Sequence, residues 1–335
     1  MINYKDIRHV HLELSTFCNA SCPLCPRNFF GYEHNNGYPE THFTLENAKT
    51  IFTSSFLQQL EEIHVSGNFG DIVMNPEGLQ VIDYFKQQNS NLRISVSTNG
   101  SARDKSFWQG LADLKVEVHF CIDGLADTHH LYRQNTVWNT VIKNAKIFTT
   151  AGGKAVWRMI EFKHNQHQIE ACRKLSQELG FVYFVVINEG RNTAPAFNHR
   201  GEHTHSLGSY NGSTDFKMLF HKKKTDTILV EDIVDDTTSI KKHVSCLSVK
   251  KSSVYISAYG EVSPCCWTGF APSTYGAGAY HQAINSQLHP LISKNNALQY
   301  SLEECIKWFS SIQSSWNIEN YQQGRLVVCD QNCGH

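Results

Sequence analysis

Six short apolar segments alternate with helical patterns over the first 190 residues, and this alternation limits the folds open to the chain. The segments cover residues 9–14, 62–66, 92–98, 115–122, 155–162 and 181–187. Strands joined through helices pair in parallel, because each crossover returns the chain to the same end of the sheet. Six such units favour an α/β fold built as a partial (β/α)6 TIM-like barrel, with an open doubly wound sheet as the alternative.

Helices are predicted between these strands from end signals and apolar stripes. Asn75 followed by Pro76 supplies an N-cap and a proline at the first helical position. Two stripes at helical spacing stop at glycine: Val137, Val141, Ala145 and Phe148 before Gly152, and Ile169, Cys172, Leu175 and Leu179 before Gly180. These stripes predict helices that pack one face on the sheet.

Composition narrows the classes of partner and compartment. The chain of 335 residues is 41% hydrophobic and 18% charged, as a globular protein is, and its net charge of -1 gives no attraction to nucleic acid or to an anionic membrane. No apolar stretch is long enough to span a bilayer, and the N-terminus lacks a signal-peptide core, so we expect a cytoplasmic protein. Eleven clustered cysteines then favour reduced metal ligands over disulfides.

Three cysteines follow the first predicted strand in the pattern C-x3-C-x2-C. They are Cys18, Cys22 and Cys25. Cubane iron–sulfur clusters and structural zinc sites normally take four protein ligands. A close group of three therefore leaves one metal position for a ligand that is not protein.

Glycine and short polar residues gather where the predicted strands end. They occupy residues 67–71, 97–100, 123–124 and 188–190. Parallel strands bring such ends to one mouth, where ligands bind. Taken singly, each group is also typical of an ordinary turn.

The cysteine motif together with residues 67–71 and 97–100 resembles the radical S-adenosylmethionine (radical SAM) superfamily. The resemblance implies a [4Fe-4S] cluster on the three thiolates, with the fourth iron bound by the amino and carboxylate groups of S-adenosylmethionine. It further implies that an external reductant such as flavodoxin or ferredoxin supplies an electron, and that the 5′-deoxyadenosyl radical released by sulfonium cleavage abstracts hydrogen from a substrate.

The resemblance also implies roles for single residues. The segment that holds the methionine amino group matches Gly67, Asn68, Phe69, Gly70 and Asp71, and further cofactor contacts are expected from Ser97, Asn99, Asp123 and Asn188. Arg133 resembles the arginine that clamps the methionine carboxylate, and a surface salt bridge is its alternative interpretation. The chain departs from the pattern at Leu24, where most members carry an aromatic residue, and at residues 67–69, which replace Gly-Gly-Glu.

The last third of the chain carries a second set of cysteines. Cys246, thirteen residues, Gly260, four residues and Cys265 resemble the opening of SPASM and twitch domains, and residues 253–257 and 261–266 predict a hairpin. Cys329 and Cys333 complete four ligands, which predicts one auxiliary Fe-S cluster of the [4Fe-4S] type; no further C-x2-C pair is present, which favours twitch. Tetrahedral zinc is the alternative.

Two other cysteines have structural interpretations. Cys305 lies on an apolar helical stripe and is expected in the core. Cys266 would point away from Cys265 in a regular strand, and would then leave the cluster.

The domains expected are a radical SAM partial barrel at 1–190, a linker or substrate-covering region at 191–243, and an auxiliary-cluster domain at 244–335. The expected reaction is hydrogen abstraction from a small-molecule substrate, with Glu161 and Glu189 as candidate substrate contacts. Radical modification of a peptide or protein side chain is the alternative reaction, and a non-catalytic zinc-binding protein is the alternative without chemistry.

Overall fold

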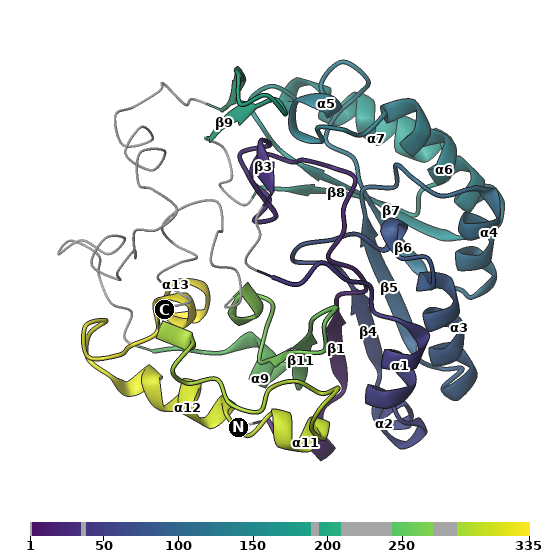
Figure 1. The fold of residues 1–335 in the computed structure, drawn as a ribbon. Helices are drawn as coiled ribbons and strands as arrows, with labels where there is room; N and C mark the ends of the chain where they lie inside the picture. The colour runs from purple at the N-terminus through teal and green to yellow at the C-terminus, as the bar shows by residue number, and fades with distance from the viewer. Residues whose placement is uncertain (1, 35–37, 189–193, 209–242, 271–286) are drawn as a thin grey trace.

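The protein is built around one eight-stranded sheet (Figure 1). The structure is a computed structural model and describes residues 2–34, 38–188, 194–208, 243–270 and 287–335. In spatial order the strands are β12 (Val262–Ser263), β11 (Ser253–Ile256), β1 (His9–Leu12), β4 (Glu62–Val65), β5 (Arg93–Thr98), β6 (Glu117–Cys121), β7 (Lys154–Ile160) and β8 (Tyr183–Ile187). All neighbours pair in parallel except β11 with β12. The six predicted strands are therefore β1 and β4 to β8, and their parallel pairing confirms the partial (β/α)6 barrel.

Helices cover the outer face of this sheet, as the apolar stripes predict (Figure 1). They are α1 (Leu45–Ile51), α2 (Ser54–Gln59), α3 (Gly78–Gln88), α4 (Lys105–Asp113), α6 (Trp138–Thr150) and α7 (Ile169–Glu178). In α6 the stripe buries Val141, Ala145 and Phe148 completely, whereas Val137 precedes the helix and is exposed. The outward faces of the strands and the inward faces of the helices thus form one apolar layer.

The predicted start of α3 at Asn75 is wrong. Glu77 occupies the N-cap position, two residues later, and makes no side-chain cap hydrogen bond. Asn75 Oδ1 still accepts from the Glu77 backbone N–H at 2.8 Å, but it does so in a turn that precedes the helix. Asn75 Nδ2 also donates to the carbonyl oxygens of Leu14 at 2.5 Å and Phe43 at 2.9 Å, so this turn is tied to two other segments.

The inner face of the partial barrel is polar. Along β1, Val10 and Leu12 point outward and are buried, whereas His9 and His11 point inward and are partly exposed. His64 on β4 pairs with His11 in register and continues this inner layer. A closed eight-stranded barrel fills its centre with branched apolar side chains, so this interior is suited to holding polar ligands instead.

The predicted C-terminal hairpin extends the barrel sheet. Strand β11 pairs in parallel with β1, and Tyr255 lies beside His11 in the register. The described C-terminal region also contains four short helices, α9 (Leu247–Lys250), α11 (Leu302–Cys305), α12 (Phe309–Ser314) and α13 (Val327–Cys333), on the same side of the molecule as the hairpin (Figure 1). Cys305 is fully buried in the apolar core, which confirms its structural interpretation.

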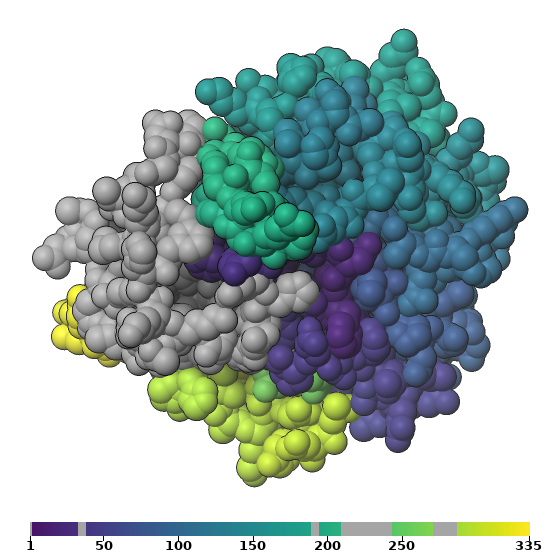
Figure 2. Space-filling model, turned by 45° about the horizontal axis from the view of Figure 1, so that its top comes forward, coloured from purple at the N-terminus to yellow at the C-terminus, as the bar shows by residue number. Residues whose placement is uncertain are grey.

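Part of residues 191–243 is ordered into a hairpin of β9 (Ala194–Phe197) and β10 (His203–Leu207). The backbone N–H of Phe197 donates to Phe30 O at 3.0 Å, which fixes the hairpin beside the short strands β2 (Asn28–Phe29) and β3 (Glu33–His34). The ring of His205 hydrogen bonds to Leu131 O in α5 (His129–Tyr132) at 2.8 Å. Figure 2 shows the hairpin, in green, at the surface against the purple N-terminal segment. Residues 209–242 of the predicted covering region lie outside the described part.

None of the helices in the described ranges combines the length and the hydropathy that a membrane span requires.

Candidate functional site

The carboxyl ends of the barrel strands surround a cavity of about 790 Å³, within the range of roughly 300–1,000 Å³ that is usual for small-molecule sites. Most of the predicted site residues line it together: Cys18, Cys22, Cys25, Gly67, Asn68, Phe69, Gly70, Asp71, Ser97, Asn99 and Arg133. Residues that the sequence separates by more than 100 positions therefore meet at one place. The strand ends that the sequence predicts to meet at one ligand-binding mouth do meet there.

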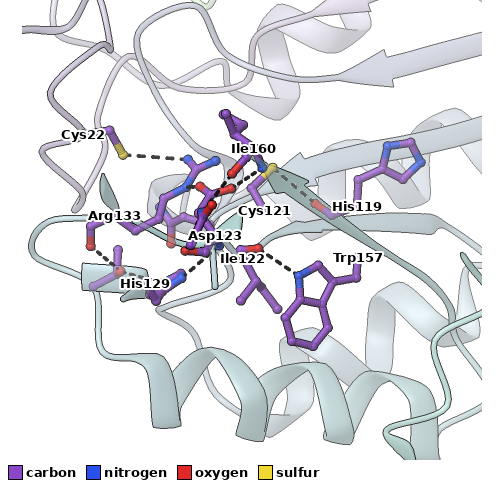
Figure 3. Close-up of polar contacts among 12 residues, drawn as sticks. Cys22, His119, Cys121, Ile122, Asp123, His129, Arg133, Trp157 and Ile160 are labelled. Atoms are coloured by element: carbon purple, nitrogen blue, oxygen red, sulfur yellow. Dashed lines mark hydrogen bonds and ion pairs between the residues drawn. The ribbon is translucent and has the colours of Figure 1, made fainter. Parts of the chain in front are cut away.

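The three N-terminal thiols lie in the loop after β1, among hydrogen-bond donors. The Ala20 backbone N–H and Asn99 Nδ2 donate to Cys18 Sγ at 3.4 and 3.6 Å, and Arg133 Nη1 donates to Cys22 Sγ at 3.7 Å (Figure 3). Burial raises the pKa of Cys22 to about 12, although the Arg133 guanidinium acts in the opposite direction, and burial also raises the pKa of Cys18. Both thiols would thus release protons on binding a metal.

The chemistry of this donor set fits an iron–sulfur cluster held by three cysteines. Donors directed at the sulfur atoms would stabilise thiolates and tune a cluster's potential. No three Cys, His, Asp or Glu side chains in the described part of the chain are close enough to hold one metal ion. A cubane cluster separates its ligands more widely, because each thiolate binds a different iron.

A buried carboxylate that sequence analysis missed shapes the loop after β4. Glu13 Oε1 accepts from the backbone N–H groups of Phe69 at 2.7 Å and Gly70 at 3.0 Å, and Tyr255 donates its hydroxyl to Glu13 Oε2 at 2.9 Å. Gly70 must be glycine, because a Cβ there would overlap the Ser15 carbonyl oxygen. Burial raises the pKa of Glu13 to about 7. Its signal in the sequence was a single carboxylate inside an apolar strand.

Asp71 connects the loop after β4 to the end of β5. Its carboxylate accepts from Thr98 Oγ1 at 2.7 Å, from the Asn99 backbone N–H at 2.7 Å and from the Val73 backbone N–H at 3.1 Å. Burial raises the pKa of Asp71, and these donors act against that rise. Asp71 therefore positions Asn99, whose amide reaches Cys18.

Asn68 and Phe69 join the same loop to other parts of the chain. Asn68 Nδ2 donates to Cys266 O at 2.8 Å, which connects the barrel to the segment after β12. The ring of Phe69 stacks on Tyr38 with a centroid distance of 4.0 Å. Both residues line the cavity, and both also hold its wall in place.

Arg133 is held against the cavity by a buried acid. Its Nε donates to Asp123 Oδ2 at 2.6 Å, and Asp123 Oδ1 accepts from the Ile160 backbone N–H at 2.6 Å (Figure 3). Asp123 is fully buried and is not part of the cavity wall, so it orients Arg133. Burial opposes the charge of Arg133, but Asp123 outweighs it, and the pKa of Arg133 rises well above its usual value. The alternative of a surface salt bridge is wrong.

The remaining candidates lie away from the cavity wall. Asn188 is exposed at the end of β8, and its Nδ2 donates to Glu161 Oε2 at 3.5 Å. Neither residue lines the cavity. Glu189 lies outside the described residues.

The four C-terminal cysteines line a second, much smaller cavity of about 40 Å³. Cys246 is the N-cap of α9, Cys265 follows β12, and Cys329 and Cys333 lie one turn apart on α13. A hydrogen bond from Cys333 lowers the pKa of Cys246 to about 6 against the effect of burial, and burial raises the pKa of Cys329 to about 12. Phe309, Ile312, Trp316 and Val328 enclose the group.

Cys265 and Cys266 face different cavities. Cys265 lines the small one, whereas Cys266 lines the barrel cavity with the N-terminal thiols. This separation agrees with the opposite orientations that the sequence predicts for the two residues. The peptide bond that joins these two consecutive residues therefore lies between the two cavities.

No protein-family model matches the chain, and no curated protein sequence does so either. Among solved structures, Streptococcus suis SuiB bound to S-adenosylmethionine superposes with a TM-score of 0.61 at 14% identity, over 98% of this chain and 73% of SuiB. SuiB bound to its precursor peptide SuiA gives 0.60 at 14% identity, over 98% and 72%. The enzyme anSMEcpe with bound S-adenosylmethionine and the Cp18Cys peptide gives 0.55 at 16% identity, over 97% and 89%.

Similarity at this level of identity concerns the fold. The superposed lengths include the partial barrel and the segment after it, which carries the second set of cysteines. The chain therefore has the same α/β architecture as proteins whose structures hold S-adenosylmethionine, a parallel-stranded partial barrel followed by a C-terminal module.

Proposed function

We propose that this protein is a radical SAM enzyme. Cys18, Cys22 and Cys25 would hold a [4Fe-4S] cluster, and S-adenosylmethionine would complete it at the fourth iron. The observation that carries the proposal is the convergence of three thiols, the loop at 67–71, Asn99 and Arg133 on one cavity. The fold shared with SuiB and anSMEcpe supports it.

When bound, the reduced cluster and S-adenosylmethionine supply a 5′-deoxyadenosyl radical that takes a hydrogen atom from the substrate. Arg133, oriented by Asp123, would bind the methionine carboxylate with its Nη groups. Asn99, positioned by Asp71, would hold Cys18 and the adjacent ligand. Leu24, Phe30, Ile160 and Phe270 line the cavity with apolar surface, which keeps water from the reacting atoms.

The four C-terminal thiols would bind one auxiliary [4Fe-4S] cluster. Four protein ligands and an enclosed space leave no position for an outside ligand, so such a site suits electron transfer or structural support. Cys266 lies at the barrel cavity next to ligand Cys265, which gives a short covalent route between the two sites. The electron left on an oxidised substrate radical could leave by this route.

Two substrate classes fit the cavity. A small molecule would fill the space remaining beside the cofactor, and its oxidation would use the auxiliary cluster as electron acceptor. A peptide or protein side chain is the second candidate, because SuiB and anSMEcpe both have structures with bound peptides.

The test is reductive cleavage of S-adenosylmethionine by anaerobically reconstituted protein with dithionite. We expect iron and sulfide to bind and 5′-deoxyadenosine to form, and we expect Cys22→Ala to lose that product. Cys172→Ala is the matched control, because Cys172 is buried in α7 away from both cavities. Equal yields from native protein and Cys22→Ala would overturn the assignment, and colourless, zinc-loaded protein would favour the non-catalytic alternative.

A further inference from the structure

A second arginine, Arg158, faces the barrel cavity. Arg158 lies on β7 between buried neighbours, points to the inner face and lines the cavity. Among residues that the structure describes, none forms an ion pair or a side-chain hydrogen bond with its guanidinium. Arg133, by contrast, is paired with Asp123 at 2.6 Å.

The described acids close to Arg158 are already used by other groups. Asp71 binds Thr98 and two backbone N–H groups. Glu117 on β6 pairs with His119 and Lys154. Asp123 is occupied by Arg133 and by a backbone N–H. Among the described residues, no acid forms an ion pair with Arg158.

The neighbouring histidines do not supply a negative charge either. Burial, with smaller contributions from nearby cations that include Arg158, lowers the pKa of His64 to about 3, and burial lowers the pKa of His11 to about 4. Both rings are therefore neutral near pH 7. A partly buried guanidinium without a counterion is costly, unless a ligand brings the counterion.

Both arginines lie near Cys121. Cys121 pairs with Arg158 in the register of β6 and β7. Burial raises the pKa of the Cys121 thiol, and both guanidinium groups act to lower that pKa. Of the two arginines on the described cavity wall, only Arg133 is paired with an acid, Asp123. The methionine carboxylate of the cofactor would account for the remaining Nη donors of Arg133, and a second anion is needed for Arg158.

We propose that Arg158 binds a carboxylate of the substrate, so that the enzyme acts on a carboxylate-bearing molecule. This inference rests on the proposed function, which assigns Arg133 to S-adenosylmethionine. A planar guanidinium binds a carboxylate through two parallel hydrogen bonds, and the cavity wall at Arg158 is completed by the small polar side chains of Ser97 and Cys121. The carboxylate belongs to a free small acid or to an acidic or C-terminal residue of a peptide.

The test uses matched acids and amides on the cluster-loaded protein with bound S-adenosylmethionine. The first pair is N-acetylalanine and N-acetylalaninamide; the second is a tetra-alanine peptide with a free or an amidated C-terminus. Affinities are measured by ligand-observed NMR titration. We expect each acid that fits to bind at least about tenfold tighter than its amide, and the pair with the larger ratio to identify the source of the carboxylate.

Variants at Arg158 test whether its guanidinium causes the tighter binding of the acid. Arg158→Gln should abolish the preference for the acid, and Arg158→Lys, which keeps the charge without the two-pronged geometry, should retain part of it. Arg93→Gln is the matched control, because Arg93 is exposed and pairs with Glu62 outside the cavity. Equal affinity for acid and amide in the native protein, or an unchanged preference in Arg158→Gln, overturns the proposal.

Cofactor binding on the same preparations separates this proposal from the proposed function. We expect Arg158→Gln to change the Kd for S-adenosylmethionine less than threefold and Arg133→Gln to raise it strongly. If Arg158→Gln weakens S-adenosylmethionine binding as much as Arg133→Gln does, Arg158 belongs to the cofactor and the substrate proposal falls. If native protein prefers acids through Arg158 but neither binds nor cleaves S-adenosylmethionine, the carboxylate site stands and the radical SAM assignment falls.

Discussion

The two cysteine sites use the same ligand and differ in number and in space. The three N-terminal thiols of the C-x3-C-x2-C motif border a cavity of about 790 Å³ at the barrel mouth, whereas the four C-terminal thiols enclose about 40 Å³ beside α13. As the ligands of the proposed clusters, the first set would leave one coordination position and the room to fill it, and the second set would leave neither. Under the proposed function, ligand number and enclosure together would separate a site for chemistry from a site for electron transfer or support.

Arg133 at the barrel cavity and Arg325 in the C-terminal region differ in how many of their hydrogen-bond donors bind protein groups. Arg133 uses one edge of its guanidinium on Asp123 and faces the open cavity. Arg325 bonds to Asp330 at 2.8 and 2.6 Å and to the carbonyl oxygens of Trp316 and Ile318, and Tyr321 donates to the same acid. Arg325 thus has a structural task, and Arg133 has unused donors at a ligand site.

The largest expected effect separates the two cysteine sites. Cys22→Ala should lower the rate of 5′-deoxyadenosine formation at least about a thousandfold, which corresponds to about 4 kcal/mol. Cys329→Ala should lose the auxiliary cluster's iron but still cleave S-adenosylmethionine within about tenfold of the native rate. Iron content and 5′-deoxyadenosine measured together check both. Equal losses in the two variants would contradict the division into a reactive and a supporting site.

The second expected effect separates the two arginines. Arg325→Gln should lower the free energy of unfolding by about 3–5 kcal/mol, because it leaves Asp330 buried with its charge poorly compensated. Arg133→Gln should instead act mainly on the Kd for S-adenosylmethionine, with an increase of about 10- to 100-fold. Urea unfolding and equilibrium binding measure the two effects. A stability loss in Arg133→Gln as large as that in Arg325→Gln would remove the distinction.

Much of this comparison could be predicted from the sequence, because it depends on local spacing. The C-x3-C-x2-C motif, the alternation of strands and helices and the apolar stripe through Cys305 are all patterns of near neighbours. Helix α3 begins two residues later than predicted, and the bonds from Asn75 to Leu14 and Phe43 could not be predicted, because these residues approach one another only in the folded protein.

Glu13 and Arg158 could not be assigned from the sequence for a related reason. Each is a charged residue with apolar neighbours on both sides, Glu13 just after β1 and Arg158 within β7, and its role depends on which strand lies beside it. The position of β11 next to β1, which brings Tyr255 to Glu13, is a pairing between residues more than 240 positions apart. Sequence periodicity shows which face a side chain takes, but the partner across that face is a property of the tertiary structure.

The third expected effect is a pH dependence of the free energy of unfolding that arises from Glu13, behind the loop after β4. Burial raises the pKa of Glu13 from 4.5 to about 7, so its contribution to stability is complete below pH 4.5 and is lost as the pH rises through 7. The loss should be roughly 3 kcal/mol. Glu13→Gln stays neutral and keeps an oxygen for the Phe69 and Gly70 N–H groups, so it should not show this loss. Unfolding free energies at pH 4.5, 6 and 8 give the comparison.

The matched control is Glu46→Gln, since Glu46 is exposed on α1. That variant should follow the pH profile of the native protein. If Glu13→Gln loses as much stability as native protein between pH 4.5 and 8, another group is responsible.

The smallest expected effect concerns the contact between the two sites. Asn68→Ala removes the 2.8 Å bond to Cys266 O and should cost about 1 kcal/mol of unfolding free energy. Asn91→Ala, at an exposed position, should change stability by less than about 0.5 kcal/mol.

The position of this bond gives Asn68→Ala a second readout. It fixes the segment whose two cysteines face the two cavities, so its loss should raise the Kd for S-adenosylmethionine two- to threefold and leave iron binding at the C-terminal cysteines unchanged. Binding at the barrel cavity would weaken first, because the wall of that cavity depends on contacts between separate segments. The small cavity is enclosed by the side chains that line it. If iron is lost from the C-terminal cysteines while S-adenosylmethionine binding stays unchanged, the small site is the one that depends on its neighbour.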